Sequence, residues 1–573
     1  MNRKHTVLSV LMALGGALAA VWLAGFDQSV AQMLKLGLAA ALAVFFCRRL
    51  LCQKDSRAQW CFGLLGFGFV LAVGLGMRLD TLDHTGWGGL ALCCLLGLLW
   101  GPAAGGAAVW IAQKLESLQP SETTHVKKTF WISFGVLLVC WLPVELAYFP
   151  GLFGYDVYEQ VGQIMENQWL THHPLAHTLL VCGFWAGGGA LGSYTMGVFG
   201  YALTQMLALA AAMAYALSCL AKLHCSKAVR IALTVLFALA PQHPLMGISV
   251  TKDIPFAITM LISCVELLKL LREPGRIFSW KKLLPLTAAL IGACLLRNNA
   301  PIAIAVFAIF AVMIIGKGRR VRMIALLCAV LLGQSALNAG MAAMLDAGKG
   351  KVNEMLSVPA QQLSRIYAKY GYDEPVSYEV IEWVPNADLY QASRADFTKM
   401  HLNVDHDGEL TGFIKFWARE LFHFPIEYID AFLLNCKGYW DPGDTSFASV
   451  YGDWPDTSVG ALITVRYPIR VEYPDLLPAV RNGLDYLYFR NEYQSIPGLS
   501  ALIHPATYSW MLLYAIAWAV WRRKREVLGT SLLMLMYLLT LFLGPCALVR
   551  YCYYLMTCAP LLTASLISPG EKA

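Results

Sequence analysis

Charged residues are scarce in this sequence. They make up 14% of the 573 residues, whereas 58% are hydrophobic. Many apolar runs approach or exceed the roughly 20 residues that cross a bilayer as a helix. This balance excludes a soluble globular protein of this length. It predicts an all-α polytopic membrane protein.

Two further absences narrow the class of protein. The net charge is +7, but Lys and Arg stand in short clusters between apolar runs rather than in one basic patch, so no nucleic-acid partner is expected. The long polar segment 346–500 contains a single cysteine, Cys436, which excludes a disulfide within that segment. The other cysteines are interpreted as small residues in helix packing.

Fourteen apolar segments predict about fourteen transmembrane helices. They are residues 6–25, 29–47, 60–77, 86–113, 129–148, 195–222, 228–242, 254–272, 282–297, 300–316, 321–345, 501–521, 527–544 and 546–566. The first follows the basic start MNRKH and is expected to be a signal-anchor helix that stays attached.

Six basic clusters orient these helices. The clusters lie within residues 48–57, 127–128, 222–230, 272–282, 317–322 and 522–525. The positive-inside rule places all six in the cytoplasm, but only if a further apolar run, 174–193, does not cross the membrane. The GGGALGS end of that run would be a poor helix terminus in hydrocarbon. We therefore predict a re-entrant or juxtamembrane helix there, with both termini of the chain cytoplasmic.

This topology divides the chain into four parts. They are a four-helix membrane extension (1–128), a membrane core (129–345) with an outer loop (149–194), an extracytoplasmic domain (346–500) and C-terminal membrane helices (501–573). In the extracytoplasmic domain, SVPAQQLSRIYAKY predicts an amphipathic helix. TGFIKFWARELFHFPIEYIDAFLLNC predicts one or two helices, interrupted near Pro425. The domain is expected to be mainly α and rich in loops.

The outer loop 149–194 contains no Lys or Arg, yet it carries Asp156 in the stretch YFPGLFGYDVYEQ. An acid near a helix end is often only solvated, but an acid in a Gly/Pro/aromatic loop at the lip of a membrane cavity suits a general base. Glu159 lies one helical turn further on and is expected to support it. Tyr155 and Gln160 are candidate substrate contacts.

His172 and His173 precede Pro174, and His177 follows. Adjacent residues point to different faces of a helix or strand, so the first two are a poor chelating pair. His173 and His177 could share a helix face, but Pro174 stands at the helix start. We therefore predict no metal ligand here and expect His172 and His173 to contact a phosphate or hydroxyl of the substrate.

Three cations stand at the outer ends of predicted helices. Lys252 is the basic residue of the loop 243–253, and it either snorkels to the interface or faces an anionic headgroup. Arg297 and Arg550 depart from the positive-inside pattern, so each is expected to have an anionic partner, either a protein acid or a lipid phosphate. Asp253 is expected to cap the helix that follows it.

The predicted topology puts the acids, the histidines and these cations at one face of the membrane. Such a set suits a reaction with an anionic leaving group. The acid Asp156 takes a proton from an acceptor hydroxyl, and Lys252, Arg297 and Arg550 hold the departing phosphate.

The ordered pieces Gly-Tyr-Asp156, His172-His173-Pro174-Leu175, Thr251-Lys252-Asp253 and Arg550-Tyr551 resemble the GT-C superfamily of membrane glycosyltransferases. The resemblance covers about residues 129–345, with weaker support to 566. Together with SVPAQQLSR, these pieces also resemble a largely uncharacterised bacterial membrane protein family that is related to that superfamily.

This resemblance implies a GT-C-like fold and an active site on the outer face of the plasma membrane. It implies an inverting transfer of a sugar, with Asp156 as base, from a polyprenyl-phosphate donor to a glycan, polymer or protein acceptor. Asp253 and Tyr551 become candidate substrate contacts. Some members need a divalent metal such as Mg or Mn and others do not. The core 129–345 lacks the superfamily's second Asp-x-Asp or Glu-x-Asp cluster, so no metal ligand is predicted.

Three other functions stay open. The first is a transporter or flippase of a lipid-linked or anionic substrate, which should carry polar residues at mid-membrane. Here the polar groups crowd one face, and the sequence has no inverted repeat. The second is a ligase or polymerase of cell-surface polymers, which shares much of the same chemistry. The third is a non-catalytic envelope protein that uses 346–500 for binding.

Overall fold

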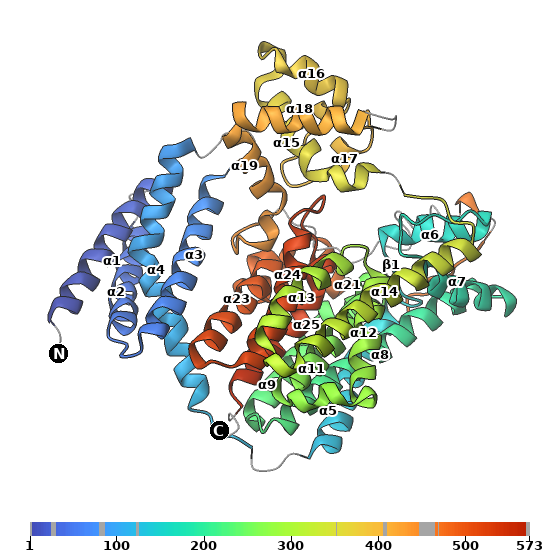
Figure 1. The fold of residues 1–573 in the computed structure, drawn as a ribbon, viewed down its shortest axis with the longest axis horizontal. Coiled ribbons are helices and arrows are strands. Elements are labelled where there is room, and N and C mark those ends of the chain that lie inside the picture. Colours follow the sequence, from blue (N-terminus) through green and yellow to red (C-terminus); the bar gives the residue numbers. More distant parts are fainter. Residues whose placement is uncertain are drawn as a thin grey trace.

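The computed structural model describes residues 3–24, 30–79, 86–121, 125–350, 352–404, 409–445, 465–467 and 469–568. The chain is all-α apart from one small two-stranded sheet among the described residues. Its helices form three groups, namely an N-terminal layer, a central bundle and a smaller outer domain, which stands at the top of Figure 1.

The N-terminal layer consists of α1 (Arg3–Ala24), α2 (Val30–Leu51), α3 (Ser56–Arg78) and α4 (Gly86–Glu116). Small residues let α3 and α4 approach closely, because a Cβ on Gly66 would overlap the backbone of Gly101 and Gly105. The layer, blue in Figure 1, stands beside the bundle and packs on it through α3 and α23 (Pro505–Arg522).

The central bundle contains the helices that correspond to the remaining apolar segments. They are α5 (Val126–Ala147), α8 (Tyr194–Lys222), α9 (Lys227–Leu239), α11 (Asp253–Arg272), α12 (Trp280–Leu296), α13 (Ala300–Ile314), α14 (Arg320–Met344), α23, α24 (Arg525–Leu541) and α25 (Val549–Leu566). Helix α25 is buried along nearly all its length and packs on α8, α11, α23 and α24.

Each of the fourteen predicted segments coincides with a helix. Seven helical stretches among the described residues are long and apolar enough to cross a membrane, as judged by length and composition. The chain therefore has the helices of a membrane-embedded protein.

Three of the six basic clusters meet at one end of the bundle. Arg272, at the end of α11, donates to Ser568 Oγ at 3.5 Å, and Lys524 donates to the carbonyl oxygen of the same residue at 3.4 Å. Lys222, at the end of α8, lies 3.7 Å from Glu273. The ends of α8, α11 and α25 thus lie together with the α23–α24 turn, as the predicted alternation of helix directions requires.

Two short helices follow α5 at the other end, α6 (Tyr155–Glu166) and α7 (Leu175–Ala190). His177, in the first turn of α7, bonds to Tyr201 at 2.8 Å, while Gly188, near its end, lies against Gly197. Both ends of α7 therefore contact the first eight residues of α8, so α7 lies across the start of α8 rather than along it. Its 16 residues measure about 24 Å, less than the roughly 30 Å hydrocarbon core.

We expect a cysteine at position 187 to be labelled only from outside the cell. Gly187 tolerates the change, because a Cβ there has no atom within 4 Å. A membrane-impermeant thiol reagent on intact cells should label Gly187→Cys, whereas the exposed Cys52, which follows α2, should react only after lysis. Labelling of position 187 solely after lysis would show that α7 crosses the bilayer.

The outer domain contains α15 (Ser357–Tyr370), α16 (Val376–Trp383), α17 (Asp396–Lys399), α18 (Glu409–His423) and α19 (Pro425–Asn435). The amphipathic helix and the interruption at Pro425 are thereby confirmed. The polar residues of SVPAQQLSR are buried, and two of them connect α15 to α19. Gln362 donates to Tyr428 O at 3.0 Å, and the fully buried Arg365 lies 3.3 Å from Asp430.

The outer domain also holds the loop that leads into α25. The amide of Ala395 donates to Pro545 O at 2.7 Å, and Asn435 Nδ2 donates to Gly544 O at the same distance. Tyr439, just after α19, donates to Cys546 O at 3.2 Å. Three carbonyls in a row are thus fixed from the outer domain, four residues before Arg550.

Candidate functional site

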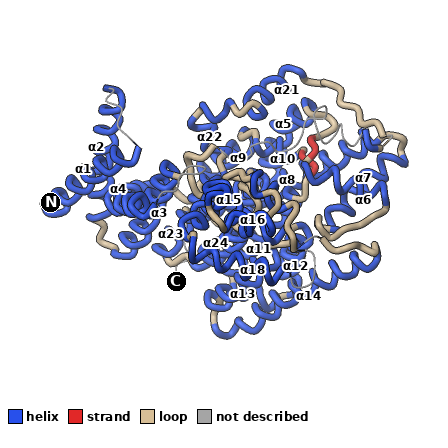
Figure 2. Tube along the Cα trace, turned by 90° about the horizontal axis from the view of Figure 1, so that it is seen from above, coloured by secondary structure: helices blue, strands red, loops and turns tan. Residues whose placement is uncertain are grey.

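A two-stranded parallel sheet aligns the outer loop with the start of α11. Strand β1 (Leu152–Phe153) pairs with β2 (Ser249–Val250), which follows α10 (Gln242–Gly247); the strands are red in Figure 2. The amide of Gly154 donates to Val250 O at 3.0 Å, and a Cβ on Gly154 would lie 2.8 Å from that oxygen. Glycine permits this close approach, which brings Asp156 beside Lys252.

Asp156 is held between two cations from distant parts of the chain. One carboxylate oxygen lies 2.8 Å from Lys252 Nζ and 3.2 Å from Arg550 Nη1, and the other accepts from Arg550 Nη2 at 3.4 Å. All three side chains are largely buried. The structure thus brings the predicted base into contact with two of the three predicted phosphate-binding residues.

Asp253 connects the third cation to this group. Its carboxylate pairs with Arg297 through one oxygen and lies 3.1 Å from Arg550 Nη1 through the other, which also accepts from Thr251 at 3.1 Å. The prediction that Asp253 caps α11 is wrong, because Lys252 is the N-cap residue and makes no side-chain cap bond. Asp253 is instead a buried counter-ion. Arg297 and Arg550 are each expected to pair with either a protein acid or a lipid phosphate, and in the structure both pair with the acid Asp253.

Tyr551 lies beneath both guanidinium groups. Its ring centroid is 4.6 Å from Arg297 Cζ and 4.8 Å from Arg550 Cζ. A ring face attracts such cations, so Tyr551 keeps the two arginines side by side despite their like charge.

We define the charge cluster as Asp156, Lys252, Asp253, Arg297 and Arg550. Three positive and two negative side chains leave it a formal charge of +1. Such a site favours an anion, and arginine is suited to phosphate because it offers paired donors.

The charges around Asp156 control its protonation. Burial raises the pKa of this carboxyl group, but the positive charges of Arg550 and Lys252 outweigh burial and hold the pKa well below its usual range. Asp156 is therefore ionised in the absence of a ligand.

Glu159 and the two histidines line the rim of the charge cluster. His173 Nδ1 lies 3.1 Å from Lys252 Nζ, and its Nε2 lies 3.4 Å from Glu159 Oε2. The His173 contact lowers the pKa of Glu159, whereas burial and the Lys252 charge lower the pKa of His173, which is therefore neutral at pH 7. The His172 and His173 rings touch, with centroids 4.5 Å apart.

Gln160, which is predicted to contact the substrate, lies outside the charge cluster. It is fully buried and bonds to His177 Nδ1 at 2.9 Å and to Thr178 Oγ1 at 3.0 Å. These bonds attach α6 to α7, so the side chain has a packing role. The side chain of Tyr155 lies outside the described part of the structure.

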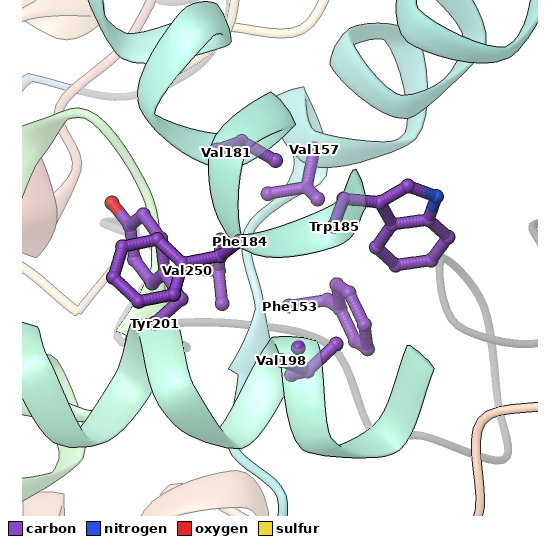
Figure 3. Close-up of a pocket in the computed structure, with 9 residues that line it drawn as sticks. Phe153, Val157, Val181, Phe184, Trp185, Val198, Tyr201 and Val250 are labelled. Atoms are coloured by element: carbon purple, nitrogen blue, oxygen red, sulfur yellow. The ribbon is translucent and has the colours of Figure 1, made fainter. Parts of the chain in front are cut away.

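A narrow apolar pocket is lined by residues of β1, β2, α6, α7 and α8, some of them close in sequence to the charge cluster; Figure 3 shows this lining. Its space is small, about 10 Å³ or roughly one water molecule, and its lining includes Phe153, Val157, Trp185, Val198 and Val250. Val157 directly follows Asp156, and Val250 stands two residues before Lys252. The apolar lining and two residues of the charge cluster therefore come from the same short segments of the chain, residues 153–157 and 250–252.

The carboxylates of the charge cluster do not fit the divalent metal that some GT-C members use. Asp156 already faces Lys252 and Arg550, and Asp253 already faces Arg297 and Arg550. A Mg or Mn ion between them would meet three fixed positive charges, whereas these ions need ligands whose negative charge is available.

Sequence reasoning missed the apolar pocket and the pairing of β1 with β2. Strands of two residues give no alternation that periodicity could detect. The pocket residues belong to apolar stretches that look like ordinary packing. The residues at helix ends were found because a charge stands out where hydrophobic residues are expected.

The family comparisons concern most of the chain. Residues 166–572 match the model of a family of unknown function, DUF6020. The matched region contains Lys252, Arg297 and Arg550 and begins ten residues after Asp156. No curated protein and no solved structure matches this chain. Because the family model covers more than half of its length, the chain belongs to the family of unknown function DUF6020.

Proposed function

We propose that the protein is a GT-C-type glycosyltransferase, which moves a sugar from a polyprenyl-phosphate donor to an acceptor at the outer face of the plasma membrane. One observation carries the proposal. A buried carboxylate, Asp156, is in contact with two cations, and the segment that carries it also lines an apolar pocket. The cations suit the phosphate of the donor, the carboxylate suits a base for the attack on its sugar, and the apolar side chains of the pocket lining suit contact with the start of its lipid tail.

In the proposed reaction, Asp156 takes the proton of an acceptor hydroxyl as its oxygen forms a bond to the anomeric carbon. The bond between that carbon and the phosphate oxygen breaks, and the electron pair leaves with the polyprenyl phosphate. Lys252, Arg297 and Arg550 stabilise the charge that develops on this leaving group. The anomeric configuration inverts because the displacement has one step.

The low pKa of Asp156 without ligand is compatible with this role. Burial acts to raise the pKa of Asp156, and the charges of Arg550 and Lys252 are the largest effects that lower it. A donor phosphate competes for these two cations and so weakens their hold on the carboxylate. We infer that Asp156 becomes a stronger base when the donor binds, which restricts proton removal to the loaded enzyme.

Transfer can be measured with the full chain in lipid nanodiscs that contain polyprenyl-phosphate sugar labelled in the sugar. With a cell-envelope extract as acceptor, we expect the label to move to the acceptor and free polyprenyl phosphate to accumulate. The Glu166→Gln variant serves as a control, because Glu166 lies on α6 but pairs with the exposed Arg466. Movement of intact donor between leaflets of liposomes, without release of sugar, would instead identify a flippase.

A further inference from the structure

A second cluster of polar side chains lies at the rim, outside the charge cluster. One ligand atom from each of Glu159, His172 and His173 lies within 4.8 Å of the others. Zinc binds imidazole nitrogen and carboxylate oxygen at about 2.0–2.2 Å, which places two ligands of one ion about 3.3 Å apart. The 3.4 Å between Glu159 Oε2 and His173 Nε2 already has this spacing. We propose that these three residues bind a zinc ion, independently of any sugar transfer.

The backbone explains how neighbouring histidines reach one ion. On a helix or strand they would diverge, but Thr171 to His173 form a turn that ends at Pro174, the N-cap of α7. The turn is fixed from outside, because the amide of Thr171 donates to Gly348 O at 2.9 Å and its hydroxyl accepts from the amide of Gly350 at 3.1 Å. Both rings are thus held on the side of Glu159 before a metal arrives.

A buried nitrogen with only a poorly aligned partner points into this cluster. His173 Nε2 is buried, in a residue only 5% exposed, and its contact with Glu159 Oε2 at 3.4 Å does not have the geometry of a hydrogen bond. A buried polar atom that lacks a well-formed hydrogen bond is costly, and a metal ion shared with Glu159 would satisfy it. Glu159 is 60% exposed in its side chain, so the cluster is reachable from solvent.

The donor set selects the kind of metal. Two imidazoles and one carboxylate suit zinc and other late first-row metals, whereas Mg prefers an all-oxygen shell. Three protein ligands leave the fourth position of a tetrahedral zinc open to water or another ligand.

The site is coupled to the charge cluster through one imidazole. In neutral His173, Nδ1 accepts from Lys252, so Nε2 carries the proton and cannot bind a metal. Zinc on Nε2 moves the ring proton to Nδ1, which then repels Lys252. The ammonium group must turn wholly to Asp156, to which it is already bonded. Zinc binding and the Lys252–His173 bond therefore exclude each other.

The test uses the purified full chain, freed of metals and dialysed against zinc chloride alone. The wild type should bind one more zinc per chain than Glu159→Gln or His172→Ala. Both of these side chains are at least partly exposed, so their replacement should not prevent folding. Glu166→Gln and the exposed His423→Ala should keep this zinc. The Lys252–His173 bond competes with zinc for the imidazole, so the Lys252→Met variant should bind zinc about tenfold more tightly than the wild type. Removal of a group that contacts a metal ligand commonly changes metal affinity by this factor.

The sixteen cysteines could also bind zinc, so cobalt provides a second readout. Cobalt at this site should give visible absorption bands without the near-ultraviolet band of a thiolate ligand, and the bands should vanish in His172→Ala. Equal zinc content in the wild type, Glu159→Gln and His172→Ala, all eluting as the same folded species, would overturn the proposal.

Discussion

Asp156→Asn should lower sugar transfer by about 10²- to 10⁴-fold, the range that a general base contributes. The amide keeps the size of the side chain but cannot accept a proton from the acceptor. Asp156 is also a counter-ion of the buried Lys252 and Arg550, so the variant should lose some stability, and rates are compared at a temperature at which both proteins are folded. The measurement is the initial rate of label transfer at saturating donor, compared with thermal unfolding of the same preparation.

Donor binding separates the role of Asp156 as a base from a role in holding the donor. Removal of the carboxylate raises the formal charge of the charge cluster from +1 to +2 and frees two cations, so polyprenyl phosphate should bind at least as tightly as to the wild type. Glu166→Gln makes the same chemical change at the other end of α6 and should transfer at the wild-type rate. Transfer by Asp156→Asn within tenfold of the wild type would rule out the base assignment.

Asp253→Asn should destabilise the folded protein by about 3–5 kcal/mol, because it leaves buried charge uncompensated. Asp253 is 1% exposed and stands between Arg297 and Arg550, which are themselves 12% and 7% exposed in their side chains. An amide cannot balance two guanidinium groups that water barely reaches. The effect should appear as a lower midpoint of thermal unfolding in detergent and a lower yield of membrane-inserted protein.

The exposed pair Arg419–Glu379 provides the matched control. Its atoms are 2.6 Å apart, but the side chains are 50% and 42% exposed, so Glu379→Gln should cost about 0–1 kcal/mol. A second change, Arg297→Met, should recover part of the stability that Asp253→Asn removes, since it deletes one of the unbalanced charges. An unfolding midpoint for Asp253→Asn equal to that of Glu379→Gln would contradict the counter-ion role.

Much of the helical layout could be read from the sequence because lipid imposes strong constraints on it. Apolar runs must form helices, and these runs locate α1 to α5, α8, α9, α11 to α14 and α23 to α25. Helix direction followed from the basic clusters, and direction in turn placed Lys252, Arg297 and Arg550 at one end. A charge in an apolar setting is costly, which is why each such residue pointed to a partner.

The partners themselves could not be deduced. Asp253 appeared to be a cap because an acid at a helix start commonly is one, and only the fold shows that Arg297 and Arg550 reach it. The two histidines were treated as if on a regular element, whereas Gly348 and Gly350, far along the chain, hold them in a turn. Pairings between remote segments depend on packing, which a single sequence does not display.

The outer domain holds the backbone carbonyls of residues 544–546, and these bonds limit how the protein can be divided. Arg550 follows them by four residues, so the side chain that contacts both Asp156 and Asp253 is positioned from the outer domain. A version of the chain without residues 346–500 would keep every residue of the charge cluster and still lose its arrangement. The membrane part and the outer domain are therefore one working unit, and neither can be exchanged alone between relatives.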